Sequence, residues 1–387
     1  MTAMAASPLP ESEDPLPPRL ASDSRAVLTL DAGGTNFAFG ALRGARDATG
    51  GLVLPSRADS LAGSLEVLVQ GFSRMRDECG GAPAAISFAF PGQADHAAGI
   101  VGNAHNLPAF RDPVPLGPIL EDHFAVPVFI NNDGDLFAYG ESLAGFLPWL
   151  NALLAASGSA RRYRNLFGVT LGTGLGGGIV HGGRPFIGDN RAAGEVWAIR
   201  NKLAREHCAE DGASIRGVRE EYARQAVVGL DRVPAPETIF EIARGRAPGD
   251  VAAAREAFRR LGEVTGDALA NALTLLDAAV VLGGGLTGAA ELFLPAVLAE
   301  LNGRIRCAGG TIERTHLRAF GLEDPADRER FLREETVPLP VPGSARTVAY
   351  DPVKRLPIGL SRLGTSRAVA VGAYAIALDG LDGRVQA

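Results

Sequence analysis

The stretch VTLGTGLGGGIV, residues 169–180, places Gly172, Gly174 and Gly177 at the GxGxxG spacing of a dinucleotide-binding turn. That fingerprint requires a helix after the glycines, because the pyrophosphate sits on the helix N-terminus. Here the next residues read IVHGGRPFIG, and their β-branched residues, Gly-Gly turn and proline predict a second strand. Glu195 belongs to the separate segment AAGEVW and does not close a Rossmann unit. We therefore interpret the stretch as strand, turn and strand, which disfavours a nicotinamide site.

Two other glycine clusters make this turn more informative. TLDAG at residues 29–33 and TLGTG at residues 170–174 share the pattern T-L-x-[AT]-G, and VVLGGGLTG at residues 280–288 follows the helical segment GDALANALTLLDAA. Backbone N–H groups in such turns bind anions, and glycine allows positive φ and close approach to phosphate oxygens. One turn alone would be an ordinary hairpin. Two turns and a third cluster favour a nucleotide clamp between two related lobes.

The remaining segments alternate between strand and helix signals. Apolar runs predict strands at residues 27–30 and 37–42, and again in AAISFAFPG and VPVFINND. Apolar residues at helical spacing predict helices around residues 65–75, over residues 134–147 just after Asp133, and in the final segment RAVAVGAYAIAL. This order predicts an α/β protein.

Length and composition limit the class of protein. The 387 residues exceed the roughly 250–300 that one core usually holds, which predicts two lobes. The net charge of -6 without a long basic run argues against nucleic acid as a partner. No apolar run reaches the roughly 20 residues of a membrane span. Three widely spaced cysteines and no signal peptide predict a cytoplasmic protein, and the Pro-, Ser- and acid-rich residues 1–24 predict a disordered tail.

Taken in order, these motifs resemble the ROK family of sugar kinases, within the actin-like ATPase superfamily. The resemblance runs from about residue 27 to residue 378 and rests on LDAGGTN, FAFPG with GIVGNAHNLPAF, NNDGDLFAYGE, TLGTGLGGGIV, AGE and VVLGGGLTG. It implies a two-lobed actin-like (ribonuclease H-like) ATPase fold with the active site in the interlobe cleft. We expect residues 25–133 plus 364–387 to form the N-terminal lobe. Residues 134–363 would form the C-terminal lobe, with an extended, Pro-rich segment at 309–363.

The resemblance also implies roles for individual residues. Asp133 matches the general base that takes the proton of the sugar hydroxyl, although an aspartate at a helix start can also be a simple N-cap. Asp31 matches the acidic residue that engages Mg²⁺, directly or through water. The residues expected to line ATP are Asp31, Gly33, Gly34, Thr35, Asn36, Gly172, Thr173, Gly174, Gly283, Gly284 and Gly285. The residues expected to bind the sugar are Pro91, Gly92, Asn106, Asn132, Asp133, Glu195 and Glu220.

One segment departs from the family pattern. ROK kinases usually carry a structural zinc held by a histidine and three cysteines, but Ala198 stands where that histidine should be. The residues at 217–220 read GVRE where the family has GCxE, and the adjacent His207 and Cys208 cannot by themselves complete a four-ligand site. We predict no structural zinc. Trp197 either fills part of that space or is an ordinary core residue.

The activity implied is ATP-dependent phosphorylation of a hexose at the 6-hydroxyl, with glucose and/or N-acetylglucosamine as substrate. Fructose, mannose and N-acetylmannosamine are alternative substrates that the sequence leaves open. A sugar-sensing ROK repressor would need a helix-turn-helix domain before the first glycine loop, and only about two dozen residues precede that loop. A catalytically silent sugar-binding protein is disfavoured because Asp31 and Asp133 are both present. From the family we also expect a homodimer.

Overall fold

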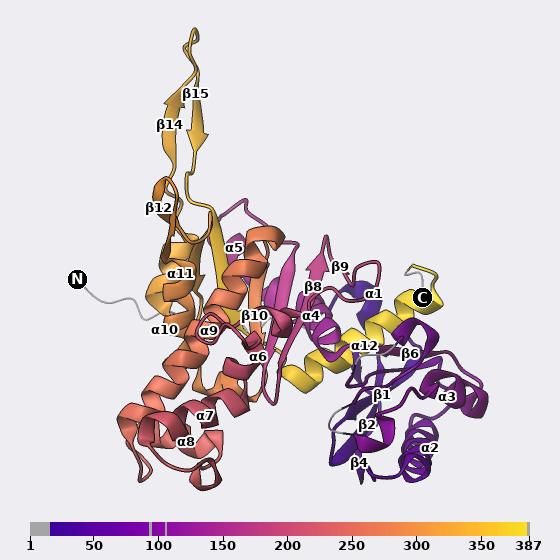
Figure 1. Cartoon of the computed structure of the whole chain (residues 1–387). Coiled ribbons are helices and arrows are strands. Elements are labelled where there is room, and N and C mark those ends of the chain that lie inside the picture. Colours follow the sequence, from indigo (N-terminus) through magenta and orange to yellow (C-terminus); the bar gives the residue numbers. More distant parts are fainter. Residues whose placement is uncertain (1–15, 93–94, 105–106, 385–387) are drawn as a thin grey trace.

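Two six-stranded sheets organise the chain in the computed structural model, which describes residues 16–92, 95–104 and 107–384 (Figure 1). The first sheet has the order β3-β2-β1-β5-β6, with β4 paired to β2. Strand β1 is antiparallel to β2 and parallel to β5, which confirms the strand–turn–strand predicted from residue 27 to residue 42. The strands are β1 (Ala26–Ala32), β2 (Asn36–Arg43), β3 (Arg46–Asp47), β4 (Leu52–Pro55), β5 (Ala85–Ala89) and β6 (Val128–Asn131).

Helices cover both faces of this sheet. Leu28 and Leu30 belong to one core cluster with residues of α2 (Leu61–Glu78) and α3 (Leu116–Phe124). Val27 belongs to another cluster with residues of α12 (Thr365–Leu381), as expected from the alternation of side chains along a strand. The last helix therefore covers one face of the first sheet.

The second sheet has the order β13-β16-β10-β7-β8-β9. Strands β7 and β8 are antiparallel and joined by the turn at residues 172–174, which confirms that a strand, not a helix, follows this turn. The strands are β7 (Leu166–Leu171), β8 (Leu175–His181), β9 (Arg184–Pro185), β10 (Ala279–Gly283), β13 (Arg318–Gly321) and β16 (Arg355–Leu360). The helices of this half are α4 (Asp133–Ala144), α5 (Phe146–Ala156), α6 (Ala209–Gly212), α7 (Ile215–Ala226), α8 (Pro236–Ala243), α9 (Val251–Leu276), α10 (Ala290–Leu301) and α11 (Pro325–Leu332).

Two helices lie between the sheets. Helix α4 packs against β7 and β8, α12 packs against β1, β5 and β6, and the two helices pack on each other. Their backbones touch, because a Cβ atom on Gly140 would overlap the carbonyl oxygen of Ala368 and one on Gly372 would overlap that of Leu136. The predicted helix over residues 134–147 is wrong at its end, since α4 stops at Ala144.

The break between α4 and α5 has a local cause. The buried carboxylate of Glu141 accepts a hydrogen bond from the Phe146 N–H at 2.7 Å and so caps the first turn of α5. It also accepts hydrogen bonds from Ser361 and from the Leu363 N–H. A Cβ atom on Gly145 would overlap this carboxylate, so the break occurs at a glycine.

The expected disordered tail over residues 1–24 is wrong for its last part. Residues 18–21 form the short helix α1 (Pro18–Ala21), whose Leu20 is fully buried. Arg19 pairs with the carboxylate of Asp379 on α12 at 2.5 Å, and the hydroxyl of Tyr139 on α4 donates to the same carboxylate at 2.7 Å. Long-range contacts thus order a segment of disorder-like composition. Residues 1–15 lie outside the described part of the chain.

The segment at 309–363 divides into two kinds of structure. Strands β13 and β16 join the second sheet. The Pro-rich part forms a hairpin of β14 (Val337–Pro340) and β15 (Thr347–Tyr350) that extends away from the body of the protein (Figure 1). A shorter hairpin pairs β11 (Arg304–Cys307) with β12 (Gly310–Glu313). Across the described ranges, none of the helices is long and apolar enough to cross a membrane.

Candidate active site

The first predicted phosphate loop is a tight turn between β1 and β2. The Gly33 N–H donates to the Asn36 carbonyl oxygen at 3.0 Å, and a Cβ atom on Gly33 would lie only 2.8 Å from that oxygen. Asp31 at the end of β1 and Thr35 in the turn are both exposed. The loop therefore presents a carboxylate, backbone N–H groups and a hydroxyl to solvent.

The second loop, residues 172–174, is held from behind by α6 and α7. The Glu210 carboxylate on α6 accepts a hydrogen bond from the Leu175 N–H at 3.0 Å, and the Ile215 N–H donates to the Gly172 carbonyl oxygen at 2.8 Å. Apart from its neighbours in the chain, no atom of the described residues lies within 4 Å of the position that a Cβ atom on Gly172 would take, so the outer side of the turn is open. Thr173 is exposed beside it.

The third loop begins at the end of β10 and packs onto the strand before the second loop. Gly284 has a φ of 89°, and a Cβ atom there would overlap the Leu171 carbonyl oxygen. Its N–H donates to the Thr365 hydroxyl oxygen at 2.8 Å, while the neighbouring Ser366 hydroxyl donates to Asp31 at 3.4 Å. The first turn of α12 therefore joins the third loop to the first. Space is open around Gly285, as it is around Gly172.

The predicted catalytic segment lies where β6 ends and α4 begins. The side-chain oxygen of Asn132 accepts hydrogen bonds from the N–H groups of Gly134, at 2.8 Å, and Asp135, so Asn132 is the N-cap and Asp133 is the first helical residue. Asp133 is thus not needed as the cap. Its Oδ1 accepts from the Gly134 N–H at 2.8 Å.

The surroundings of Asp133 make its carboxylate more basic than usual. Asp133 is accessible to solvent, but the protein around its carboxylate displaces part of the water, and this desolvation raises the pKa of Asp133. The negative charges of Asp31 and Glu195 raise the pKa further, while the Gly134 N–H opposes the rise. The carboxylates predicted for the phosphate and sugar sides are therefore close enough to interact.

Two glycines of the opening stretch, Gly177 and Gly178, serve packing together with Gly134, which is a role that the motif alone does not reveal. A Cβ atom on Gly134 would overlap the Gly177 carbonyl oxygen, one on Gly178 would overlap that of Gly134, and one on Gly177 would overlap that of Gly194. Strand β8 thus lies in backbone contact with the start of α4 on one side and with the AGE loop on the other. This contact places Asp133 and Glu195 beside each other.

Glu195 is held by an aromatic neighbour. The indole N–H of Trp197 donates to the Glu195 carboxylate, and the ring packs half-buried against the core of the second lobe. Among the described residues, no group of three or more His, Cys, Asp or Glu side chains is arranged to hold a metal. His207 instead contacts Asp211 at 2.8 Å. Mg²⁺ commonly uses one or two carboxylates with substrate phosphates and water, so the exposed Asp31 suits it without such a cluster.

Sequence reasoning missed three polar residues near this site. The Oδ1 atom of Asp135 is buried and makes no hydrogen bond within the described structure. Burial raises the pKa of Asp135 to about 7. The negative charges of Glu195 and Asp133 add to this rise, and the positive charge of Arg191 opposes it. Burial and the charge of Arg191 lower the pKa of His96, whose Nε2 atom is likewise buried without a partner. Asp135 lies within the quoted NNDGD motif and could have been identified. Nothing in the local sequence marks the other two.

The sugar-binding roles of two residues, Glu220 and Asn106, stay predictions. Glu220 on α7 lines a groove of about 420 Å³ with Asn201, Arg224 and Arg260, and none of the other predicted site residues lines that groove. Asn106 lies outside the described residues. Pro91 and Gly92 follow β5, and Gly92, with a φ of 101°, lies against the Gly102 backbone. This close contact explains the glycine after Pro91.

Comparisons with known proteins agree with this architecture. The family model described as "ROK family" matches residues 27–311. A glucokinase from Halalkalibacterium halodurans is 25% identical over 79% of this chain and 89% of its own length, and an N-acetyl-D-glucosamine kinase from Photobacterium profundum is 29% identical over 67% and 83%. The crystal structure of a glucokinase from Parabacteroides distasonis matches with a TM-score of 0.82 and 48% identity, over 93% of this chain and 99% of that one. The fold is the two-lobed actin-like ATPase fold of these kinases, and the chain belongs to the ROK family.

Proposed function

We propose that this chain transfers the γ-phosphoryl group of ATP to the 6-hydroxyl of a hexose. The observation that carries the proposal is Asp133, which starts α4 where that helix touches β8, and whose pKa is raised by burial and by the charges of Asp31 and Glu195. Phosphoryl transfer needs positioning, charge neutralisation and a group that accepts the hydroxyl proton. A base contributes most when its pKa is shifted toward the working pH, typically about 10²–10⁴-fold.

The proposed chemistry divides between the two sides of the site. With Oδ1 held by the Gly134 N–H, the other oxygen of Asp133 takes the proton as the C6 oxygen attacks the γ-phosphorus. The bond from the γ-phosphorus to the bridging oxygen breaks and ADP leaves. Asp31 would hold Mg²⁺, which neutralises charge on the phosphates. The turns that contain Gly33, Gly172 and Gly285 would line those phosphates.

We propose glucose as the first substrate and N-acetylglucosamine as the second. The 48% identity to a glucokinase over 93% of the chain supports glucose, and the similarity to an N-acetyl-D-glucosamine kinase supports the second sugar. The side-chain oxygen of Asn132 accepts the hydrogen bond that caps α4, so its NH₂ group is left to donate to a sugar hydroxyl. Glu195, oriented by Trp197, would accept from another hydroxyl.

The test is ADP release from MgATP against a panel of hexoses, with Asp133→Asn beside the parent and the phosphorylated position read by ³¹P NMR. We expect sugar-dependent turnover with glucose that falls about 10²–10⁴-fold in the variant, with little change in KM for the sugar. Sugar binding without turnover in the parent would contradict a kinase and favour a silent sugar sensor.

A further inference from the structure

Two side chains near the proposed general base hold buried polar atoms without a partner. The Oδ1 atom of Asp135, in the first turn of α4, and the Nε2 atom of His96 make no hydrogen bond among the described residues. Three arginines also hold one such nitrogen, but each bonds through another nitrogen: Arg161, Arg219 and Arg355. An unpaired buried polar atom costs roughly 1–3 kcal/mol of stability. Such a cost at a site indicates a ligand that completes the hydrogen bonds.

The two unpaired groups come from different parts of the fold. The backbone at Asp135 touches β8 so closely that a Cβ atom on Gly178 would overlap the Cα atom of Asp135. His96 begins the short 3₁₀ helix η1 (His96–Ala98), which packs against β6, and β6 is the strand that precedes α4. Both groups therefore lie next to the start of α4, although the chain reaches that place by two separate routes.

One arginine is within electrostatic reach of both groups. Burial raises the pKa of Asp135 and the charge of Arg191 opposes this rise, while burial lowers the pKa of His96 and the same charge adds to the fall. Arg191 lies between β9 and Glu195 and has a φ of 54°, which residues other than glycine rarely adopt. Its guanidinium makes no ion pair or hydrogen bond within the described chain. A strained backbone thus presents an unpaired cation beside two unpaired polar groups.

The chemistry of these groups selects an uncharged ligand with hydroxyl groups. The carboxylate of Asp135 and the guanidinium of Arg191 cancel in charge, and the lowered pKa keeps the His96 ring neutral. A phosphate or carboxylate ligand would be repelled by the negative charges of Glu195 and Asp133, which act on the same place. A hydroxyl both donates and accepts, so a carboxylate, an imidazole and a guanidinium can each pair with one. Neighbouring ring hydroxyls of a hexose have this chemistry.

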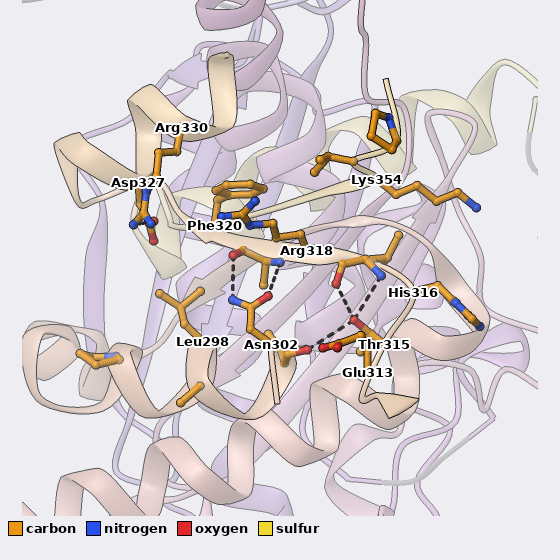
Figure 2. A pocket seen from close by; sticks show the side chains of 17 residues that line it. Leu298, Asn302, Glu313, Thr315, His316, Arg318, Phe320, Asp327, Arg330 and Lys354 are labelled. Atoms are coloured by element: carbon orange, nitrogen blue, oxygen red, sulfur yellow. Dashed lines mark hydrogen bonds and ion pairs between the residues drawn. The ribbon is translucent and has the colours of Figure 1, made fainter. Parts of the chain in front are cut away.

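Two hollows elsewhere in the molecule do not hold such unpaired groups. In the hollow of about 640 Å³ at the edge of the second sheet, the amide of Asn302 pairs with the backbone N–H and carbonyl oxygen of Ala319 (Figure 2). Asp327 in the same hollow pairs with Arg330. None of the buried unpartnered atoms of the described residues belongs to the lining of this hollow or of the groove at Glu220. The observations therefore favour the place beside α4 as a ligand site.

We propose that Asp135 and His96 bind two neighbouring ring hydroxyls of the sugar whose 6-hydroxyl faces Asp133, and that Arg191 donates to the oxygen atoms of the same hydroxyls. This assignment rests on the kinase function proposed above. The carboxylate of Asp135 accepts from one hydroxyl, and the Nε2 atom of His96 pairs with the next. A sugar that lacks one of these hydroxyls leaves a buried polar group unpaired and is therefore disfavoured. The three residues would thus help to determine which hexose is accepted.

Sugar binding to the full-length protein without ATP tests the proposal by isothermal titration calorimetry. The ligands are glucose and its 1-, 2-, 3- and 4-deoxy derivatives. We expect Asp135→Asn to weaken glucose binding at least about 10-fold, but to change the binding of one deoxy sugar less than about 3-fold, because that sugar lacks the hydroxyl that Asp135 binds. His96→Phe should show the same pattern with the deoxy sugar of a neighbouring position. Arg191→Gln should weaken glucose binding about 10-fold, and Arg191→Lys, which keeps the charge, should restore part of it.

Matched controls separate a sugar contact from an effect on the fold. Asp122→Asn on α3 and Arg184→Gln on β9 change exposed residues and should leave every dissociation constant unchanged, and urea melts show that each variant is folded. If Asp135→Asn weakened the binding of all the sugars equally, or left glucose binding unchanged, Asp135 would not contact a hydroxyl and the proposal would be overturned. A parent protein that binds no hexose would refute the proposed kinase function itself, and this subsite with it.

Discussion

The carbonyl oxygen of Gly177 lies so close to Gly134 that a Cβ atom on Gly134 would overlap it. Strand β8 and the start of α4 therefore meet backbone to backbone, and Asp133 takes its position from this contact. Side chains at these two glycines would separate the second phosphate loop from the proposed base.

Gly177→Ala should lower kcat at least about 100-fold, because the new methyl group would overlap the Gly194 carbonyl oxygen and move Glu195 and β8 relative to Asp133. Steady-state kinetics with a thermal melt measure the effect. Gly81→Ala is the control, since nothing in the described part of the chain beyond its own neighbours lies within 4 Å of the position that its Cβ would take. Full activity in a folded Gly177→Ala protein would show that this close approach does not position Asp133.

The pH dependence of kcat should report the charge of Glu195. In the proposed mechanism Asp133 acts as a carboxylate, so activity should fall when pH drops below its pKa, and the raised pKa should move this acid limb above that of an ordinary aspartate. Glu195→Gln removes one negative charge and should shift the limb to lower pH. Glu220→Gln, in the separate groove, should leave it in place. The measurement is kcat against pH at saturating sugar, and an unmoved limb in Glu195→Gln would rule out this coupling.

Asp135→Asn should stabilise the protein at alkaline pH and not at acid pH. The folded state holds the Asp135 proton up to about pH 7, whereas the unfolded chain releases it near 3.8. The stability from this group is therefore full below about pH 4 and is lost as pH rises to 7. We expect a gain of about 2–4 kcal/mol in the free energy of unfolding at pH 8. Asp122→Asn, exposed on α3, is the control for urea melts at pH 4 and pH 8.

Arg19→Gln should cost stability without changing the chemistry. Arg19 shares the nearly buried Asp379 carboxylate with the Tyr139 hydroxyl and so ties α1 to the two central helices. Arg19 itself is partly exposed, which limits the expected loss to about 1–2 kcal/mol. Arg74→Gln breaks an exposed pair on α2 and should change stability by less than about 0.5 kcal/mol. Equal losses in the two variants would argue against a structural role for α1.

Thr365→Val should raise KM for ATP about 10-fold and leave KM for the sugar unchanged. The Thr365 hydroxyl accepts the Gly284 N–H, and valine would leave this donor unpaired and loosen the third loop. Thr365→Ser keeps the hydroxyl and should restore the parent value. If KM for the sugar rose together with KM for ATP, the substitution would not be acting through the third loop alone.

Local signals predicted the elements that depend on a few neighbouring residues. The turns after Leu30 and Leu171 and the helix start at Asp133 follow from glycines and a polar cap within a handful of positions. Features that depend on distant partners were not predictable. The order of α1 rests on Asp379, the break at Gly145 rests on Glu141, and the packing role of Gly177 requires Gly134 and Gly194. Arg191 lies far from His96 and Asp135 in the sequence, and only the folded structure shows that its charge acts on both.

The position of α12 has a consequence for how the protein is made. This helix covers one face of the first sheet, yet it is encoded more than three hundred residues after β1. At a synthesis rate of roughly 5–20 residues per second, about 15–70 s pass between the synthesis of β1 and the synthesis of α12, and this face of the sheet stays uncovered by α12 for that time. The first lobe therefore cannot complete its core until α12 has been synthesised, and until then the second lobe or another protein would have to shield the exposed face of the sheet.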